Sequence, residues 1–345
     1  MESGQMLNNL MEGGEIKKFA YVWLSALAAL SYSRFVSSKL PKGKWRLISI
    51  SPVLFLFAIL PLHTPSAFIR ALTAFFLTWL ASFKLLLFSF DLGPLHSDPP
   101  KSLPVFLAAA ALPFTLAPAA SPRNPPKLPL NFPAKIAIAA LLISLLFERR
   151  RNLHPIVIML LYCLLLFLMI EIMVGLSSKA AWALLGAELQ PPSDEPYLAA
   201  SLQDFWGRRW NLTVSGVLRE AVFQPARAAA GAAVGARAAA MVGVLASFLV
   251  SGVMHELLFW YLTPGARPSW EMTGFFVLHG VCVVAEFAGK GRWRLPGFVA
   301  VAFVIGTSFW LFFPPVMRNG VDVRVIEEIR FAGEVLLNFL FRFTT

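Results

Sequence analysis

The sequence contains little charge. Only 14% of its 345 residues are Asp, Glu, Lys or Arg, against about 25% in soluble domains. Hydrophobic residues make up 57% of the chain, and the mean hydropathy is +0.67. This balance excludes a soluble globular enzyme and a disordered chain. It predicts an integral membrane protein, with residues 1–345 forming a single membrane domain.

Cysteine is scarce as well. The two cysteines, Cys163 and Cys282, lie inside apolar runs, and neither is part of a CxxC or Cys/His spacing. A disulfide framework and a structural zinc site are therefore unsupported, and we expect no metal.

Acidic residues are outnumbered by basic ones, 19 to 30, which gives a formal net charge of +11. In a soluble protein this excess would suggest nucleic acid as a partner. In a membrane protein it instead favours anionic lipid headgroups and polyanionic ligands, so we expect no nucleic acid.

Several catalytic motifs are absent. None of the five histidines is followed by Asp at the fourth or fifth position, which excludes the HxxxD and HxxxxD motifs that several acyltransferase families use. The sequence also lacks GxSxG, HExxH, Walker A and GxGxxG motifs. Serine hydrolase, metalloprotease, ATPase and dinucleotide-binding functions therefore have no support.

Long apolar runs are what the sequence does contain. Seven are long enough to cross a bilayer as helices, and two shorter ones, Leu103–Ala117 and Phe132–Phe147, are borderline. The fold class predicted is an all-α polytopic membrane protein with seven to nine transmembrane helices. The seven clear runs are Phe19–Val36, Leu47–Leu62, Phe68–Phe90, Pro155–Leu176, Ala238–Leu262, Trp270–Ala288 and Phe298–Phe313.

Basic clusters leave the orientation in the membrane open. They lie at 39–46, 149–151 and 290–294, and the positive-inside rule would place all three in the cytosol. Three clear runs, an odd number, separate the second cluster from the third. Either the long connecting region 177–237 contains a further crossing, or one cluster departs from the rule.

The candidate chemistry begins with a histidine in the run 238–262. Ser247, Ser251 and His255 follow one another at helical i, i+4 spacing and form one polar stripe, which predicts a cavity or tunnel wall. The alternative is a structural core histidine. His279 and Glu286 also share a helical face in the next run, where we predict a structural contact.

The connecting region 177–237 carries a second constellation. Trp206, Arg208, Arg209, Trp210 and Asn211 lie within six residues. The arginines suit phosphate groups and the amide suits a hydrogen bond to a substrate. The alternative is an amphipathic helix on the bilayer surface with snorkelling arginines. At the other end of the chain, the tail 325–343 is predicted to form an interfacial helix.

The two segments "SLQDFWGRRWN" and "SGVMHELLFWYL" together resemble the membrane-bound O-acyltransferase superfamily, in which an Asn-containing aromatic motif precedes a His in an apolar span. The closer similarity is to the plant wax synthase family. It extends to "FAYVWLSALAALSYSRFVSSKLPKGKWRLISI" and "FFLTWLASFKLLLFSFDLGPL". The Ala-rich stretch 226–240 between the two motifs departs from the resemblance.

The resemblance implies an acyl-CoA-dependent O-acyltransferase of the endoplasmic reticulum membrane. It would esterify a long-chain fatty alcohol to a wax ester in a catalytic tunnel and release CoA, with acyl-CoA as co-substrate and no bound cofactor. His255 would be the general base and Asn211 a hydrogen-bond donor, while Arg208, Arg209, Trp206 and Trp210 would bind acyl-CoA. A sterol or diacylglycerol acyltransferase remains an alternative, as does a transporter or channel. The oligomeric state is left open.

Overall fold

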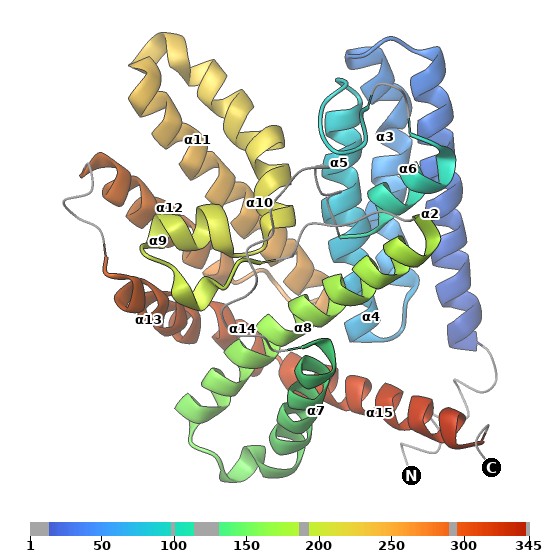
Figure 1. Ribbon diagram of the computed structural model, residues 1–345, viewed down its shortest axis with the longest axis vertical. Coiled ribbons are helices and arrows are strands. Elements are labelled where there is room, and N and C mark those ends of the chain that lie inside the picture. The colour runs from blue at the N-terminus through green and yellow to red at the C-terminus, as the bar shows by residue number, and fades with distance from the viewer. Residues whose placement is uncertain (1–13, 98–100, 114–130, 186–192, 290–294, 343–345) are drawn as a thin grey trace.

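The fold was analysed in a computed structural model, which describes residues 14–97, 101–113, 131–185, 193–289 and 295–342 (Figure 1). Helices and short connections account for all of these residues, and no strand occurs among them. The prediction of an all-α protein is confirmed.

Within the described ranges, seven helical stretches are long and apolar enough to cross a membrane, and each contains most of one clear apolar run. The prediction of a polytopic, multi-pass membrane protein is therefore confirmed. The seven stretches are Gly14–Lys39, Lys44–His63, Ala67–Phe88, Pro155–Ser177, Leu212–Leu262, Glu271–Ala288 and Gly297–Arg318.

The two borderline runs form helices that are not among these seven. The helix α6 (Leu103–Ala111) has nine residues, which at 1.5 Å per residue is about half of the bilayer core. Residues 114–117 of that run lie outside the described residues. The helix α7 (Phe132–Arg149) has 18 residues and packs as a hairpin against α8 (Pro155–Leu185).

The N-terminal part is a tightly packed bundle. The helices α2 (Gly14–Lys39), α3 (Lys44–Ile59), α5 (Ser82–Phe88) and α6 share one apolar core with the segment 74–81, which continues from α4 (Ala67–Thr73). A short 3₁₀ turn, η1 (Leu60–His63), follows α3. The fully buried Lys84 ammonium donates to the carbonyls of Ala109 and Leu112 at 2.7 and 2.8 Å. Because these are terminal carbonyls of α6, the lysine caps that short helix.

The C-terminal part contains a helical hairpin that the apolar pattern did not reveal. The helix α11 (Gln224–Leu262) changes direction at Gly235, whose φ of 75° is accessible mainly to glycine. Its two arms run side by side in Figure 1. A Cβ at Gly243 would lie 2.7 Å from the Phe223 ring, so the returning arm packs against the segment that precedes α11.

This hairpin gives the connecting region 177–237 a structure. The first arm continues from α10 (Leu212–Leu218), so a helical rod precedes the predicted span 238–262. The Ala-rich stretch 226–240 therefore forms the hairpin tip. The candidate spans count this rod and the predicted span together as one stretch, Leu212–Leu262, so the orientation in the membrane stays open. The basic cluster at 290–294 lies outside the described residues, as do 186–192 of the connecting region.

The tail is helical as predicted, in α15 (Val321–Arg342), and it packs on α4, on α7 and on the preceding helix α14 (Phe313–Arg318). Ile326 and Ile329 contact the α7–α8 hairpin. The Glu328 carboxylate accepts from the backbone N–H groups of Ala67 and Phe68 at 3.0 and 2.8 Å, which satisfies the first turn of α4. Thus α15 joins the N-terminal bundle to the α7–α8 hairpin.

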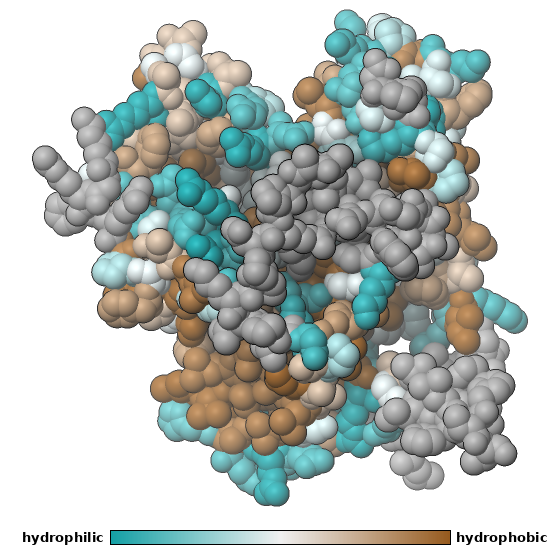
Figure 2. All heavy atoms as spheres, viewed as in Figure 1, coloured by the Kyte–Doolittle hydropathy of each residue, from teal (hydrophilic) through white to brown (hydrophobic). Residues whose placement is uncertain are grey.

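The surface agrees with a membrane location. Figure 2 shows brown side chains gathered over the region where α7 and α8 lie in Figure 1, with a teal rim beyond them. On α8, Ile156, Leu160 and Leu164 are all more than two-fifths exposed. Apolar side chains exposed in this way face lipid in a membrane protein.

Four segments of the described chain are π-helical rather than α-helical. They are η2 (Ala74–Ala81), η5 (Phe205–Arg209), η6 (Arg219–Phe223) and η7 (Ser308–Phe312). The last of these separates α13 (Gly297–Thr307) from α14 (Phe313–Arg318). Short π-helical turns frequently occur at functional sites because they shift side chains out of the regular helical register. All four contribute side chains to the same cavity.

Candidate active site

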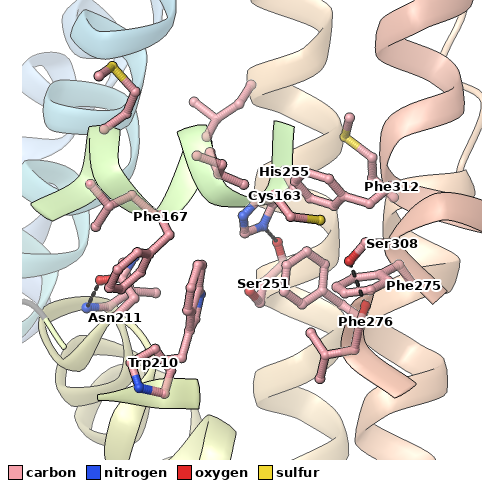
Figure 3. A pocket seen from close by; sticks show the side chains of 18 of the residues that line it. Cys163, Phe167, Trp210, Asn211, Ser251, His255, Phe275, Phe276, Ser308 and Phe312 are labelled. Carbon is pink, nitrogen blue, oxygen red and sulfur yellow. Dashed lines mark hydrogen bonds between the residues drawn. The ribbon is translucent and has the colours of Figure 1, made fainter. Parts of the chain in front are cut away.

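A central cavity of about 1470 Å³ lies between the two parts of the molecule (Figure 3). All four π-helical segments line it, together with α4, α8, α10, the second arm of α11, α12 (Glu271–Ala288), α13, α14 and α15. Most of the lining side chains are Phe, Leu, Ile, Val and Met. The cavity is larger than the roughly 300–1,000 Å³ of common ligand pockets. Its size and apolar wall suit long apolar chains.

The predicted polar stripe faces this cavity. Ser247, Ser251 and His255 all line it, as the i, i+4 spacing indicated. The Ser247 hydroxyl donates to the carbonyl of Gly243, four residues earlier, at 2.9 Å. The stripe is therefore part of a cavity wall rather than of a helix–helix contact.

One ring nitrogen of His255 is hydrogen-bonded, and no residue in the described part of the chain bonds to the other. Nδ1 lies 2.7 Å from the Ser251 carbonyl oxygen. Because a carbonyl oxygen only accepts hydrogen bonds, the proton of the neutral imidazole must be on Nδ1. Nε2 therefore carries a lone pair, and Figure 3 shows the second ring nitrogen turned away from Ser251. This is the protonation state that a general base requires.

Aromatic rings hold the imidazole in place. Phe276 stacks on it with ring centres 4.2 Å apart and an interplanar angle of 26°. Trp79 and Phe312 meet it edge to face at 4.9 and 5.8 Å. These rings come from η2, α12 and η7, so three separate elements fix the orientation of one side chain.

Asn211 lines the same cavity and begins α10. Its backbone has the left-handed φ of 41°, and its Oδ1 accepts from the Val214 backbone N–H at 3.2 Å. Since an N–H can only donate, the amide oxygen must face Val214, and Nδ2 is left as a donor. The helix cap thus decides which end of the amide is available to a ligand. Figure 3 shows Asn211 and His255 on either side of Trp210.

Trp206 and Trp210 also line the cavity. Trp210 stacks on Phe205 with ring centres 5.6 Å apart and an interplanar angle of 13°. The indole N–H of Trp206 donates to Nδ1 of His279 at 3.0 Å. Both indoles are therefore fixed wall elements.

Arg208 and Arg209 lie outside the cavity lining. Arg208 is exposed, whereas Arg209 pairs with Asp204 at 2.7 Å and donates to the Asp194 carbonyl at 3.0 Å. Burial raises the pKa of the Asp204 carboxyl, but hydrogen bonds from the Ala200 N–H and from Arg209 outweigh it and lower the pKa below its usual value. Arg209 thus fastens one end of the aromatic motif to the preceding loop.

The structure adds an arginine that the sequence analysis missed. Arg219 lines the cavity, and its side chain is exposed. Asn211, Ser215 and Arg219 follow one another at i, i+4 spacing, and all three line the cavity. The same stripe argument that identified His255 would therefore have identified Arg219 as well.

His279 and Glu286 make the structural contacts that were predicted. His279 is fully buried, and its Nε2 lies 2.8 Å from the Thr307 hydroxyl, which itself donates to the Phe303 carbonyl. With Trp206 on Nδ1, both ring nitrogens of His279 are occupied. Glu286 accepts from the backbone N–H groups of Leu202 and Gln203, at the start of the short helix α9 (Leu202–Asp204). Thus α12 holds the aromatic motif in position.

Glu256, the neighbour of His255, points to a different partner. Its side chain is buried, and Oε1 accepts from the Trp270 backbone N–H at 2.8 Å. Because Trp270 immediately precedes α12, the carboxylate stabilises the first turn of that helix. Across the described part of the chain, no group of three His, Cys, Asp or Glu residues could hold a metal ion.

Comparison with known proteins identifies the family. Residues 189–278, which include both Asn211 and His255, match the membrane bound O-acyl transferase family. A "Long-chain-alcohol O-fatty-acyltransferase" of Simmondsia chinensis is 44% identical, with 91% of this chain and 94% of that protein covered. A "Probable long-chain-alcohol O-fatty-acyltransferase 1" of Arabidopsis thaliana is also 44% identical, over 89% of this chain and 93% of that protein.

A third relative has a different name. The "Acyl-CoA--sterol O-acyltransferase 1" of Arabidopsis thaliana is 37% identical over 91% of this chain and 95% of that protein. Each of these relatives is aligned along nearly its whole length, and the family match covers the segment that carries both candidate polar groups. The chain therefore belongs to the membrane-bound O-acyltransferase family.

Proposed function

We propose that this protein transfers a fatty acyl group from acyl-CoA to a long-chain fatty alcohol and releases a wax ester and free CoA. The observation that carries the proposal is the bond from His255 Nδ1 to the Ser251 carbonyl, inside a cavity suited to two long chains. It leaves Nε2 as a proton acceptor at the cavity wall.

The chemistry needs such a base, because an unactivated alcohol attacks a thioester poorly. In the proposed step, Nε2 of His255 accepts the hydroxyl proton while the alcohol oxygen bonds to the thioester carbon. The C–S bond then breaks, and the imidazolium returns the proton to the CoA sulfur. General base catalysis of this kind contributes typically about 10² to 10⁴-fold to the rate.

Asn211 is proposed to stabilise the charge that develops on the thioester oxygen. The hydrogen bond from the Val214 N–H to its Oδ1 leaves Nδ2 as the donor. Because this bond already orients the side chain, no reorganisation free energy is needed when the reaction occurs. One oriented donor of this type is worth about 3 to 4 kcal/mol in the transition state.

The acyl-CoA site is proposed to lie along the stripe of Asn211 and Arg219. An exposed arginine in the cavity wall suits the phosphates of CoA, while Trp206 and Trp210 would border the acyl chain. Arg208 and Arg209 remain candidates only for contacts outside the cavity, and Arg209 would have to give up its bond to Asp204.

The choice of acceptor follows the names of the relatives. The two at 44% identity are named for long-chain alcohols, and the one named for sterols is 37% identical. We propose the endoplasmic reticulum membrane as the location, because the resemblance to the plant wax synthase family implies it. No described feature of the cavity favours a transporter or channel over an acyltransferase.

The test is an assay in microsomes from a host that makes no wax ester of its own. Labelled palmitoyl-CoA is supplied with hexadecanol, a sterol or a diacylglycerol, and the esters are separated. Wax ester is expected only when both palmitoyl-CoA and hexadecanol are present, and it should be lost in His255→Ala. If sterol ester or diacylglycerol ester is the main product, the acceptor is a sterol or a diacylglycerol and the proposed fatty alcohol is wrong. If the protein instead carries a solute across the membrane without CoA, the proposed acyltransferase function is wrong.

A further inference from the structure

A second buried polar group lies in the cavity wall, away from His255. The Asp322 carboxylate, at the start of α15, has only 3% of its side chain exposed. Its Oδ2 accepts from Tyr162 at 2.7 Å and from Arg150 at 2.6 Å. Both Asp322 and Tyr162 line the cavity, next to apolar side chains such as Phe313 and Ile326.

The other carboxylate oxygen lacks a partner. Oδ1 of Asp322 is buried and forms no hydrogen bond with any residue that the structure describes. A buried carboxylate oxygen without a hydrogen bond destabilises the folded protein, because it has lost its water partners and gained none. An oxygen of this kind in the wall of a ligand cavity is therefore a candidate for a contact that forms only when the cavity is filled.

Rings connect this group to the reacting centre. From His255, centroid distances of 5.8 Å to Phe312, then 5.5 Å to Phe313, then 6.1 Å to Tyr162 lead along the wall. Three ring contacts therefore lead from His255 to Tyr162, the hydrogen-bond partner of Asp322. A long alkyl chain can span this length. A chain reacting at His255 could place its far end beside Asp322.

The chemistry of the oxygen selects the ligand. A carboxylate accepts hydrogen bonds and donates none, so it repels phosphates and gains nothing from a thioester or an unsubstituted chain. It gains from a hydroxyl group. We propose that Asp322 is a second hydroxyl-binding position, which selects long chains that carry a hydroxyl at the end remote from the reacting group.

Two kinds of substrate supply that chemistry: an α,ω-diol as the acceptor, or an ω-hydroxyacyl chain on CoA. This inference rests on the proposed acyltransferase function and names a substrate class for it. The reaction itself is unchanged, because the remote hydroxyl is bound and does not react.

The experiment compares acceptors that differ only at the far end. Wild-type protein receives palmitoyl-CoA with hexadecanol, hexadecane-α,ω-diol or ω-methoxyhexadecanol. The diol has two equivalent reactive ends, which accounts for a factor of two. A preference of roughly tenfold in kcat/KM over the methoxy compound is expected, since a hydrogen bond to a charged group is worth about that much. A second arm with ω-hydroxypalmitoyl-CoA and hexadecanol identifies which chain reaches Asp322.

The variant Asp322→Asn tests the residue without changing its shape. Arg150 and Tyr162 both donate, so the amide oxygen must face them and the NH₂ group takes the place of Oδ1. The variant should therefore lose the preference for diol over the methoxy compound, because an NH₂ group can donate to either oxygen. Tyr162→Phe, which leaves Oδ1 untouched, should keep the preference.

Two further measurements make the result decisive. Across diols from decane to octadecane, activity should peak at one length, because the two polar positions are a fixed distance apart. The diol should also raise the Tm of purified protein more than ω-methoxyhexadecanol does, a readout that needs no catalysis. Equal activity and equal Tm for both acceptors in wild type, together with equal rates for ω-hydroxypalmitoyl-CoA and palmitoyl-CoA, would overturn the proposal and leave Oδ1 as a site for water. Failure of hexadecanol to react would instead count against the proposed function alone.

Discussion

The two histidines of the adjacent helices α11 and α12 differ in how many ring nitrogens are still available for a hydrogen bond. His279, on α12, uses both nitrogens, one for Trp206 and one for Thr307. His255, on α11, uses one nitrogen for a backbone carbonyl and keeps the other at the cavity wall. His279 is fully buried and His255 is half-buried. The number of unoccupied ring nitrogens is what separates the structural histidine from the candidate catalytic one.

The largest effect should come from His255→Ala. Loss of the base should reduce esterification by about 10² to 10⁴-fold while protein level and Tm stay near wild type. The measurement is kcat with saturating palmitoyl-CoA and hexadecanol, normalised to protein amount. If His279→Ala loses more turnover per folded molecule than His255→Ala, the roles assigned to the two histidines are reversed.

The second-largest effect should come from Asn211→Asp. This variant separates the helix-capping role of the Asn211 oxygen from the hydrogen-bond-donating role of its amide nitrogen. Aspartate keeps the oxygen that accepts from Val214 and tolerates a left-handed backbone, but it has no amide hydrogen. We expect kcat to fall by about 10² to 10³-fold with an unchanged Tm. Asn211→Ala is the matched control and should lose both kcat and stability. Full activity in the Asp variant would limit Asn211 to a capping role.

His279→Ala should show the opposite pattern. It leaves the Trp206 indole and the Thr307 hydroxyl without their partner in a buried site, which costs about 1–3 kcal/mol. Thermal unfolding in detergent should show a lower Tm, whereas kcat per folded molecule should change much less than in His255→Ala. Thr307→Val breaks the same contact from the other side and should also lower the Tm. An unchanged Tm in both variants would contradict the structural role.

The smallest effect should come from the arginines. Arg219→Ala should raise the KM for acyl-CoA roughly two- to fivefold, because an exposed ionic contact is weak and screened by salt. The salt dependence of that KM should decrease with it. Arg208→Ala is the control and should leave KM unchanged, since Arg208 lies outside the cavity lining. If Arg208→Ala raises the KM and Arg219→Ala does not, the phosphates of CoA bind at the arginines that the sequence analysis suggested.

Much of the site could be predicted from spacing. The i, i+4 stripe of Ser247, Ser251 and His255 does line a cavity, and the seven clear apolar runs are the seven long helical stretches. Residue type alone was a weaker guide. Arg208 and Arg209 suggested phosphate binding, but Arg209 pairs with Asp204, five residues before it, and neither arginine lines the cavity.

The sequence by itself determined that this is a helical membrane protein, because apolar runs of bilayer length have no other stable arrangement in lipid. It also determined the helical face on which His255 lies. Only the tertiary structure decided that Nε2 is the free nitrogen, that Phe276 and Trp79 enclose the ring, and that Gly235 turns the alanine-rich stretch into a hairpin. Asp322 and Tyr162 are 160 residues apart in the chain. Their contact follows from the packing of distant segments and cannot be predicted from any local periodicity.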